Sequence, residues 1–109
     1  METEFRITLT SEDIIFIEFS NDRGNVEDFA VKLVCVIDGQ RYEVVRHDSA
    51  HDCPHKDILD VPGRIEHKRK LWYDYLNNNQ ALTLAIADIK ENHEFYRERF
   101  IKWLKQNQQ

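Results

Sequence analysis

The spacing of the apolar residues changes once along the chain, and this change constrains the fold more than any other feature. In the first half, apolar and polar residues alternate, as from Phe5 to Leu9 and again from Phe29 to Ile37. Such alternation predicts strands with one buried face. After about residue 78 the apolar residues recur at spacings of three and four, which predicts one long amphipathic helix. The helix stripe comprises Leu82, Ala85, Ile86, Ile89, Tyr96, Phe100, Trp103 and Leu104.

The order of these elements predicts an α+β fold, in which a curved antiparallel sheet of four or more strands packs on one long C-terminal helix. A chain of 109 residues is expected to form a single domain, 1–109, with one core. We expect strands over about 4–48, a histidine-rich loop and a small hairpin over 48–77, and the helix over about 78–105.

The pairing of two strands can be predicted from one turn. Asp38-Gly39 lies between alternating runs, and an Asp-Gly pair is the strongest short hairpin signal. Read as a two-residue loop, it sets Val31 opposite Arg46, and the apolar face of the first strand meets Tyr42 and Val44 on the second. This register places Arg46 and Asp48 on the inner, helix-facing side of the sheet and His47 on the outer side.

Three further local features carry expectations. A bulge near Gly24, or a loop of odd length, is needed to keep all the apolar faces aligned. Pro62-Gly63 is expected to turn the small hairpin, with Ile65 to Trp72 as its second strand. One of the three asparagines at 77–79 is expected to cap the helix.

Charge and cysteine content exclude some classes of function. The net charge of −5 argues against broad, non-specific binding of nucleic acid, which needs clustered Lys and Arg. A basic segment at 64–70 is either a solvated loop or a patch that steers an anion to one site. No apolar run approaches the roughly 20 residues needed to cross a bilayer, so no membrane partner is expected. With only Cys35 and Cys53, a disulfide framework is not expected and a cytoplasmic location is favoured.

The most informative stretch for function is 47–55, His-Asp-Ser-Ala-His-Asp-Cys-Pro-His, where three histidines recur at intervals of four. Zinc accepts His, Cys and carboxylate ligands. However, Pro54 interrupts any helix that would align His51 with His55, and no third ligand has a familiar spacing. No metal or other cofactor is therefore predicted, and a metalloprotein remains a third interpretation.

A metal-free acid–base site is the leading interpretation of this stretch. Two histidines can serve as base and acid near neutral pH. A guanidinium beside them would stabilise a pentacoordinate phosphate, which is sufficient chemistry to cleave RNA through its 2′-hydroxyl. The candidate catalytic residues are His51, His55, Arg46 and Asp48, and the candidate substrate-binding residues are Lys56 and Arg69. The simpler alternative is that Arg46 and Asp48 form a structural salt bridge that closes the end of the sheet.

The helix carries polar residues whose roles are left open. The apolar stripe is interrupted at Asn92 and His93, close to where the candidate site is expected. His93 is expected either to meet Arg46 and Asp48 or to lie on the surface. The charged residues from Lys90 to Lys102, including Arg97, are interpreted as a solvated face with ion pairs between successive turns.

The run from Val45 to Asp57 resembles a small family of archaeal and bacterial proteins with the pattern R-x-D-x-A-H-x-x-P-H-x-D, followed by a helix with D-I-x-x-N. In this chain the latter motif is Asp88-Ile89-Lys90-Glu91-Asn92. The layout of sheet, histidine-rich loop and C-terminal helix is also similar to small toxins of the TumE type. That similarity implies a toxin–antitoxin role, with RNA as target and an antitoxin-like protein as partner. The matching motif positions are Arg46, Asp48, His51 and His55.

Three functions therefore remain as hypotheses. The first is a metal-independent ribonuclease of toxin–antitoxin type. The second is a non-enzymatic binding or complex-forming module, in which the same residues brace a long loop. The third is a metal-binding hydrolase, and the sequence leaves a homo-oligomer open in each case.

Overall fold

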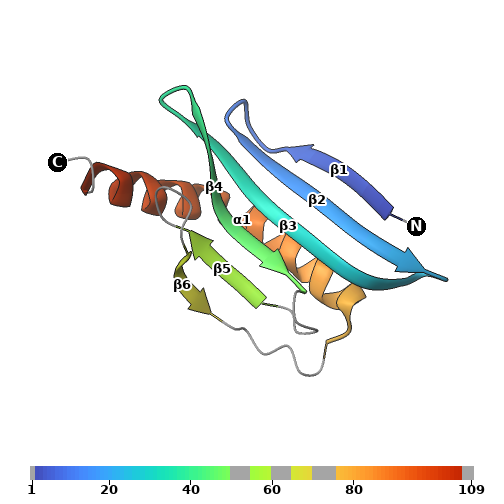
Figure 1. Ribbon diagram of the computed structural model, residues 1–109. Helices are drawn as coiled ribbons and strands as arrows, with labels where there is room; N and C mark the ends of the chain where they lie inside the picture. The colour runs from blue at the N-terminus through green and yellow to red at the C-terminus, as the bar shows by residue number, and fades with distance from the viewer. Residues whose placement is uncertain (1, 50–54, 60–64, 70–75, 107–109) are drawn as a thin grey trace.

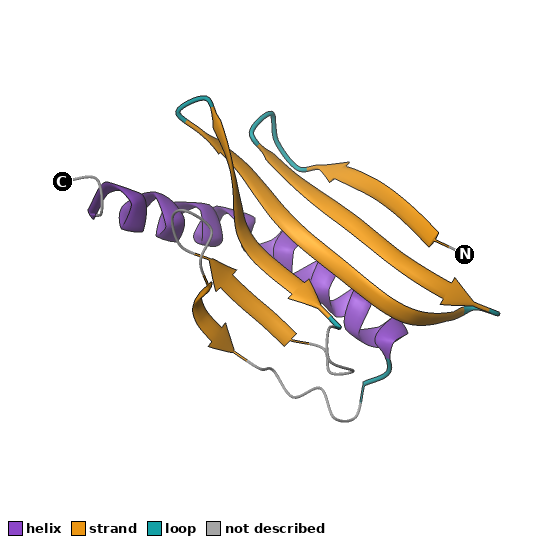
Figure 2. Cartoon of the chain, in the orientation of Figure 1, coloured by secondary structure: helices purple, strands orange, loops and turns teal. Residues whose placement is uncertain are grey.

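The computed structural model describes residues 2–49, 55–59, 65–69 and 76–106 (Figure 1). The elements are β1 (Glu2–Thr8), β2 (Asp13–Asp22), β3 (Asn25–Ile37), β4 (Gln40–Asp48), β5 (His55–Leu59), β6 (Ile65–Arg69) and α1 (Asn78–Gln106). The strands form one antiparallel sheet in chain order, β1 to β6, and α1 lies along one face of it (Figure 2). The predicted α+β architecture, a curved antiparallel sheet on one long C-terminal helix, is confirmed.

Two tight turns connect the central strands. Arg23-Gly24 and Asp38-Gly39 all have positive φ, at 52°, 83°, 51° and 78° in that order. Positive φ at both central residues defines a type I′ turn, whose twist matches that of the flanking strands. The two-residue loop at Asp38-Gly39 is therefore confirmed. The register of β2 and β3 shifts between Ser20 and Asn21, which confirms the bulge expected near Gly24.

A second bulge, which was not predicted, changes the outcome for β4. Cys35 pairs with Tyr42 as expected, but the register shifts between Leu33 and Val34, so Leu33 pairs with Val45. Because facing alternates along a strand, one extra residue reverses every later side chain. Val31 therefore pairs with His47, whose side chain points inward and is only 3% exposed.

The inner-face assignment of Arg46 and Asp48 was therefore wrong. Arg46 pairs with Lys32 and Asp48 with Ala30, both of which lie on the sheet face opposite α1. The outward assignment of His47 was wrong for the same reason. The error arose because the predicted register did not include the extra residue in β4. The pairing between the turn and this residue, such as Cys35 with Tyr42, was predicted correctly.

The core forms between α1 and the inner faces of β2, β3 and β4. The helix packs chiefly against β3. At about 3.3 Å per residue the 13 residues of β3 span about 43 Å, and at about 1.5 Å per residue the 29 residues of α1 span a similar length. The buried apolar residues are Ile15, Ile17, Phe29, Val31, Leu33, Cys35, Ile37, Val44, Val45, Ala81, Leu82, Ala85, Ile89, Tyr96, Phe100 and Leu104.

The start of α1 is held by the expected asparagines. The Asn77 side chain accepts a hydrogen bond from the Gln80 backbone N–H at 2.8 Å, and the Gln80 side chain accepts one from the Asn77 N–H at 3.0 Å. This reciprocal pair is a capping box, so Asn77 is the N-cap. Asn79 accepts from the Val26 N–H at 2.7 Å and donates to the Gly24 carbonyl at 3.0 Å, which ties the helix to the β2–β3 turn.

The small hairpin is also present. β5 and β6 pair antiparallel, with Lys56 opposite Arg69. The second strand ends at Arg69. Pro62-Gly63, expected at the turn, and residues 70–72 lie outside the described residues.

Candidate functional site

Five of the six candidate site residues lie on three neighbouring strands: Arg46 and Asp48 on β4, His55 and Lys56 on β5, and Arg69 on β6. On β4 and β5, Asp48 pairs with His55, His47 with Lys56, and Arg46 with Asp57. Lys56 in turn pairs with Arg69 on β6. Paired Cα atoms in an antiparallel sheet lie about 4.5–5.5 Å apart, so these positions form one contiguous region. We call Arg46, Asp48, His55 and Asp57 the β4–β5 site.

The remaining candidate, His51, falls outside the described residues, as does Cys53. The chain leaves β4 at Asp48 and enters β5 at His55. His51 therefore belongs to the connection between two paired positions of the β4–β5 site.

Arg46 is held in place by a residue of its own strand. Its Nε and Nη2 atoms donate to the Glu43 carboxylate at 3.0 and 2.8 Å. This is the bidentate geometry that fixes the plane of a guanidinium. Both side chains are partly exposed on the outer face, so the pair positions the cation beside solvent rather than inside the core.

A hollow of about 550 Å³ lies on the outer face next to this pair. Its wall includes Arg46, Asp48 and Lys32 on one side. It also carries four further carboxylates, from Glu2, Glu4, Glu18 and Asp28. A ligand in this hollow would therefore meet cationic groups near the β4–β5 site and anionic groups over β1–β3.

Directly beneath the outer face, His47 fastens β4 to the helix. Its Nε2 donates to Asp88 Oδ2 at 2.8 Å, because a carboxylate oxygen only accepts. Asp88 also accepts from the Tyr96 hydroxyl at 2.7 Å and from the Asn92 amide at 3.0 Å. We call His47, Asp88, Asn92 and Tyr96 the His47 clamp. It locks the strand residue that lies between Arg46 and Asp48.

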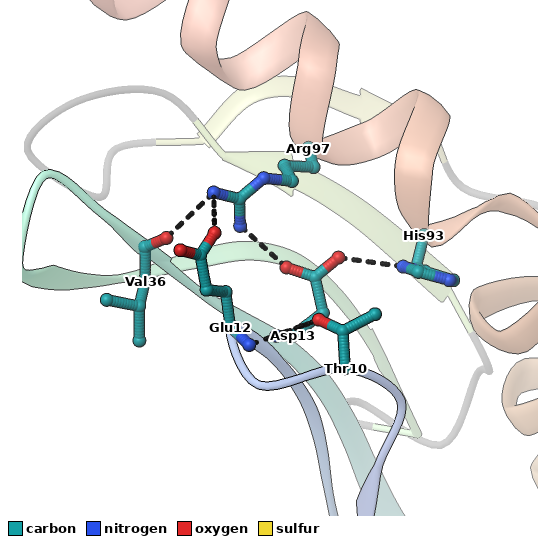
Figure 3. A network of polar contacts seen from close by, with 6 residues as sticks. All are labelled: Thr10, Glu12, Asp13, Val36, His93 and Arg97. Atoms are coloured by element: carbon teal, nitrogen blue, oxygen red, sulfur yellow. Dashed lines mark hydrogen bonds and ion pairs between the residues drawn. The ribbon is translucent and has the colours of Figure 1, made fainter.

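A second polar network joins α1 to the start of β2 (Figure 3). The buried Asp13 carboxylate accepts from His93 Nδ1 and from Arg97 Nη1, both at 2.7 Å. Arg97 Nη2 also donates to Glu12 at 2.6 Å and to the Val36 carbonyl at 2.9 Å. Burial alone lowers the pKa of Arg97, but its hydrogen bond to Asp13 and the charge of that carboxylate outweigh burial and raise it.

These contacts correct two expectations for the helix. His93 meets Asp13 rather than Arg46 or Asp48, and it is neither a member of the β4–β5 site nor a surface residue. Arg97 was expected on the solvated face, but it is inserted between α1 and the sheet. Both roles follow from a buried carboxylate on β2, which needs hydrogen-bond donors.

Comparison with known families identifies the family of this chain. The family described as Domain of unknown function (DUF7718) matches residues 1–106. The chain belongs to the DUF7718 family. Searches of curated proteins and of solved structures each found no match.

The residues that sequence reasoning missed in this DUF7718 chain left detectable signals. Asp13 continues the alternation of Ile15 and Ile17 by one step, which places a carboxylate on the buried face. Adjacent Val44 and Val45 break strict alternation, as a bulge does. Placing the bulge there would have turned His47 inward.

Two further findings concern only the described residues. In 2–49 and 76–106, no three His, Cys, Asp or Glu side chains group as metal ligands would. In the same part of the DUF7718 chain, no helix combines the length and the apolar character needed to cross a bilayer.

Proposed function

We propose that this chain cleaves RNA without a metal ion, at the β4–β5 site, and that it acts as the toxin of a toxin–antitoxin pair. One observation carries the proposal: Asp48 pairs with His55 and Arg46 with Asp57. His55 and Arg46 are therefore diagonal neighbours on adjacent strands, about 7–8 Å apart, so a candidate acid–base residue and a candidate cation stand within the span of one phosphodiester. The similarity in layout of sheet, histidine-rich loop and C-terminal helix to small toxins of the TumE type supports the same role.

The reaction needs two proton transfers and one anion-stabilising group. One of His51 and His55 takes the proton of the 2′-hydroxyl, and that oxygen attacks the adjacent phosphorus. The other histidine gives a proton to the departing 5′ oxygen. The products are a 2′,3′-cyclic phosphate and a 5′-hydroxyl end, so no water and no metal is consumed. Arg46 stabilises the added charge on the pentacoordinate phosphorus.

The His47 clamp supports this role by fixing β4 between Arg46 and Asp48, next to the strand that carries His55. A catalytic group must be held within about 0.5 Å of its productive geometry. His47 is buried and bonded to the helix, so β4 cannot shift without breaking that bond. The Glu43 carboxylate fixes the Arg46 plane from the same strand.

The central experiment incubates purified protein with a labelled RNA oligonucleotide in EDTA and identifies the product ends. We expect a 2′,3′-cyclic phosphate, and a 2′-deoxy residue at the cleaved position should block the reaction. His51→Ala and His55→Ala should each lower the rate by about 10²–10⁴-fold. His67→Ala is the matched control, since His67 lies on β6, where it pairs with Ile58 of β5, and belongs to no proposed step.

Three results would count against the proposal. Cleavage by His51→Ala at the wild-type rate would remove the assigned acid–base pair. Loss of all cleavage in EDTA, with recovery on adding a divalent ion, would favour the metal-binding hydrolase. Equal cleavage rates for wild type and all three variants would indicate a contaminating nuclease.

A non-enzymatic binding module is the second candidate, and a specific observation favours it. Glu43 already offsets the charge of Arg46, and carboxylates dominate the far wall of the hollow. Both features weaken attraction for a polyanion. If the chain is a binding module, His51→Ala should lower the melting temperature, and neither this variant nor the wild type should cleave RNA.

A further inference from the structure

Strand β1 is an edge of the sheet. Among the described residues it pairs only with β2, and it lies at the end of the sheet opposite β6 (Figure 1). The unpaired side of an edge strand presents backbone N–H and C=O groups that can template a further strand. Phe5, at the middle of β1, is 42% exposed although it lies on the apolar face with Ile17.

We propose that β1 pairs antiparallel with β1 of a second copy of this chain, about a two-fold axis at Phe5, so that the two sheets join into one. The seven residues Glu-Thr-Glu-Phe-Arg-Ile-Thr read as a self-complementary strand. A two-fold contact is isologous, so each favourable pair occurs twice. The surface is distinct from the β4–β5 site, and the proposal does not depend on RNA cleavage.

The charges select this register. With Phe5 opposite its copy, Glu4 of each chain lies opposite Arg6 of the other. Cross-strand pairs of opposite charge stabilise a sheet, whereas like charges directly opposite destabilise it. The remaining pairs, Thr3 with Ile7 and Glu2 with Thr8, contain no like charges.

Neighbouring registers are disfavoured by the same rule. Centring the axis on Glu4 sets that carboxylate opposite its own copy, and centring it on Arg6 does the same for the guanidinium. A shift by one residue instead sets Phe5 opposite Glu4 or Arg6. The apolar face of one copy would then lie on the same side of the joined sheet as the polar face of the other. Among these registers, only the Phe5-centred one sets Glu4 and Arg6 opposite each other with no like charges opposite, and it keeps both apolar faces on one side.

The side chains at the centre of this strand are already ordered. The Phe5 ring packs edge-to-face on Phe19 at 6.4 Å, and the Arg6 guanidinium lies 5.2 Å from the centre of the Phe16 ring. Side chains held in place before association lose less conformational entropy when a partner binds. Charge on an edge strand usually discourages pairing, but here Glu4 and Arg6 carry opposite signs, and each meets the other when the strand is paired with its reversed copy.

Sedimentation equilibrium of the purified chain tests the proposal. We expect a dimer for wild type, and monomers for Glu4→Arg and for Arg6→Glu, because each change sets like charges opposite. Mixing the two variants should restore a dimer, since the strand with arginine at positions 4 and 6 then faces a strand with glutamate at both positions. The double variant Glu4→Arg/Arg6→Glu should also be a dimer, with the polarity of both pairs reversed.

Controls separate pairing from folding and from net charge. Far-UV circular dichroism should be unchanged in each variant, since residues 4 and 6 are exposed. Glu98→Arg changes the net charge by the same amount as Glu4→Arg, but at an exposed position of α1, and should remain a dimer. A wild-type protein that stays monomeric at about 100 μM overturns the proposal. So do single variants that dimerise as well as wild type, or variants that do not associate when mixed.

Discussion

Asp13 and Asp88 determine how the helix sits on the sheet. Each carboxylate lies between α1 and a strand and accepts hydrogen bonds from a histidine and a second side chain. A buried ionised group is unfavourable unless it is paired, so losing one partner leaves the others unsatisfied. Apolar packing alone would let the helix slide along the sheet, whereas two directional networks fix its position.

We predict that Asp88→Ala lowers the free energy of unfolding by about 2–3 kcal/mol, because buried His47 and the Tyr96 hydroxyl both lose their acceptor. Urea denaturation followed by circular dichroism would measure the change. Glu91→Ala, at an exposed position on the same helix, should stay within about 0.5 kcal/mol of wild type. Equal stability of the two variants would mean that the His47 clamp contributes nothing.

Cys35 provides a pH-dependent prediction. Burial, reinforced by the charge of Asp13, raises the pKa of its thiol from 9.0 to about 12. The folded state therefore holds this proton more tightly than the unfolded state. The resulting stability is fully present below pH 9.0 and is lost as the pH rises towards about 12.

Comparison with Cys35→Ala isolates this effect, since alanine has no proton to lose. Relative to that variant, wild type should lose about 2 kcal/mol of unfolding free energy between pH 8 and pH 10.5. Denaturation curves at several pH values would measure the difference. A difference that does not change with pH would show that the thiol ionises normally in the folded protein.

Among the elements, β4 shows how one residue decides what a strand presents. The inserted residue buries both Val44 and Val45 and turns His47 inward, which leaves Arg46 and Asp48 on the outer face. The pairing of β4 with β5 then sets His55 and Asp57 beside them. The candidate site thus depends on a bulge several residues away from it.

The start of α1 is predicted to depend on two asparagines for separate reasons. Asn77→Ala removes the N-cap and should lower the free energy of unfolding by about 1 kcal/mol. Asn79→Ala removes both hydrogen bonds to the β2–β3 turn and should lower it by a similar amount. Thermal unfolding would measure both, with Lys90→Ala as an exposed control. If the Asn79 variant matches that control, the helix is not anchored to the turn.

At the scale of the whole molecule, stability should be graded from β3 outward. β3 is covered by α1 and paired on both sides, whereas β1 is an edge strand. We predict that the amides of Val31, Leu33 and Cys35 exchange most slowly with deuterium and that those of β1 exchange faster. If copies associate through β1, exchange there should slow as protein concentration rises. Mass spectrometry of peptides at two concentrations would measure both effects.

Sequence patterns predicted the elements because their signals are local. Alternation, the Asp38-Gly39 turn and the three-and-four spacing of α1 each act within a few residues. The site was predicted less well, since the facing of Arg46 and His47 depended on counting residues correctly through a bulge. Residues 51 and 53 lie outside the described residues, so their part in the site stays a prediction.

By itself, the sequence determined the type and order of the elements, the two hairpin turns and the capped start of the helix, because local hydrogen bonding and burial periodicity suffice for these. The tertiary structure alone decided which partners the polar residues between helix and sheet meet. Asp13 meets His93 and Arg97 across 80 and 84 positions of sequence separation, and His47 reaches Asp88 only because of the β4 bulge. Such partners are selected by the requirement that every buried charge be paired, and that requirement acts only once the helix lies on the sheet.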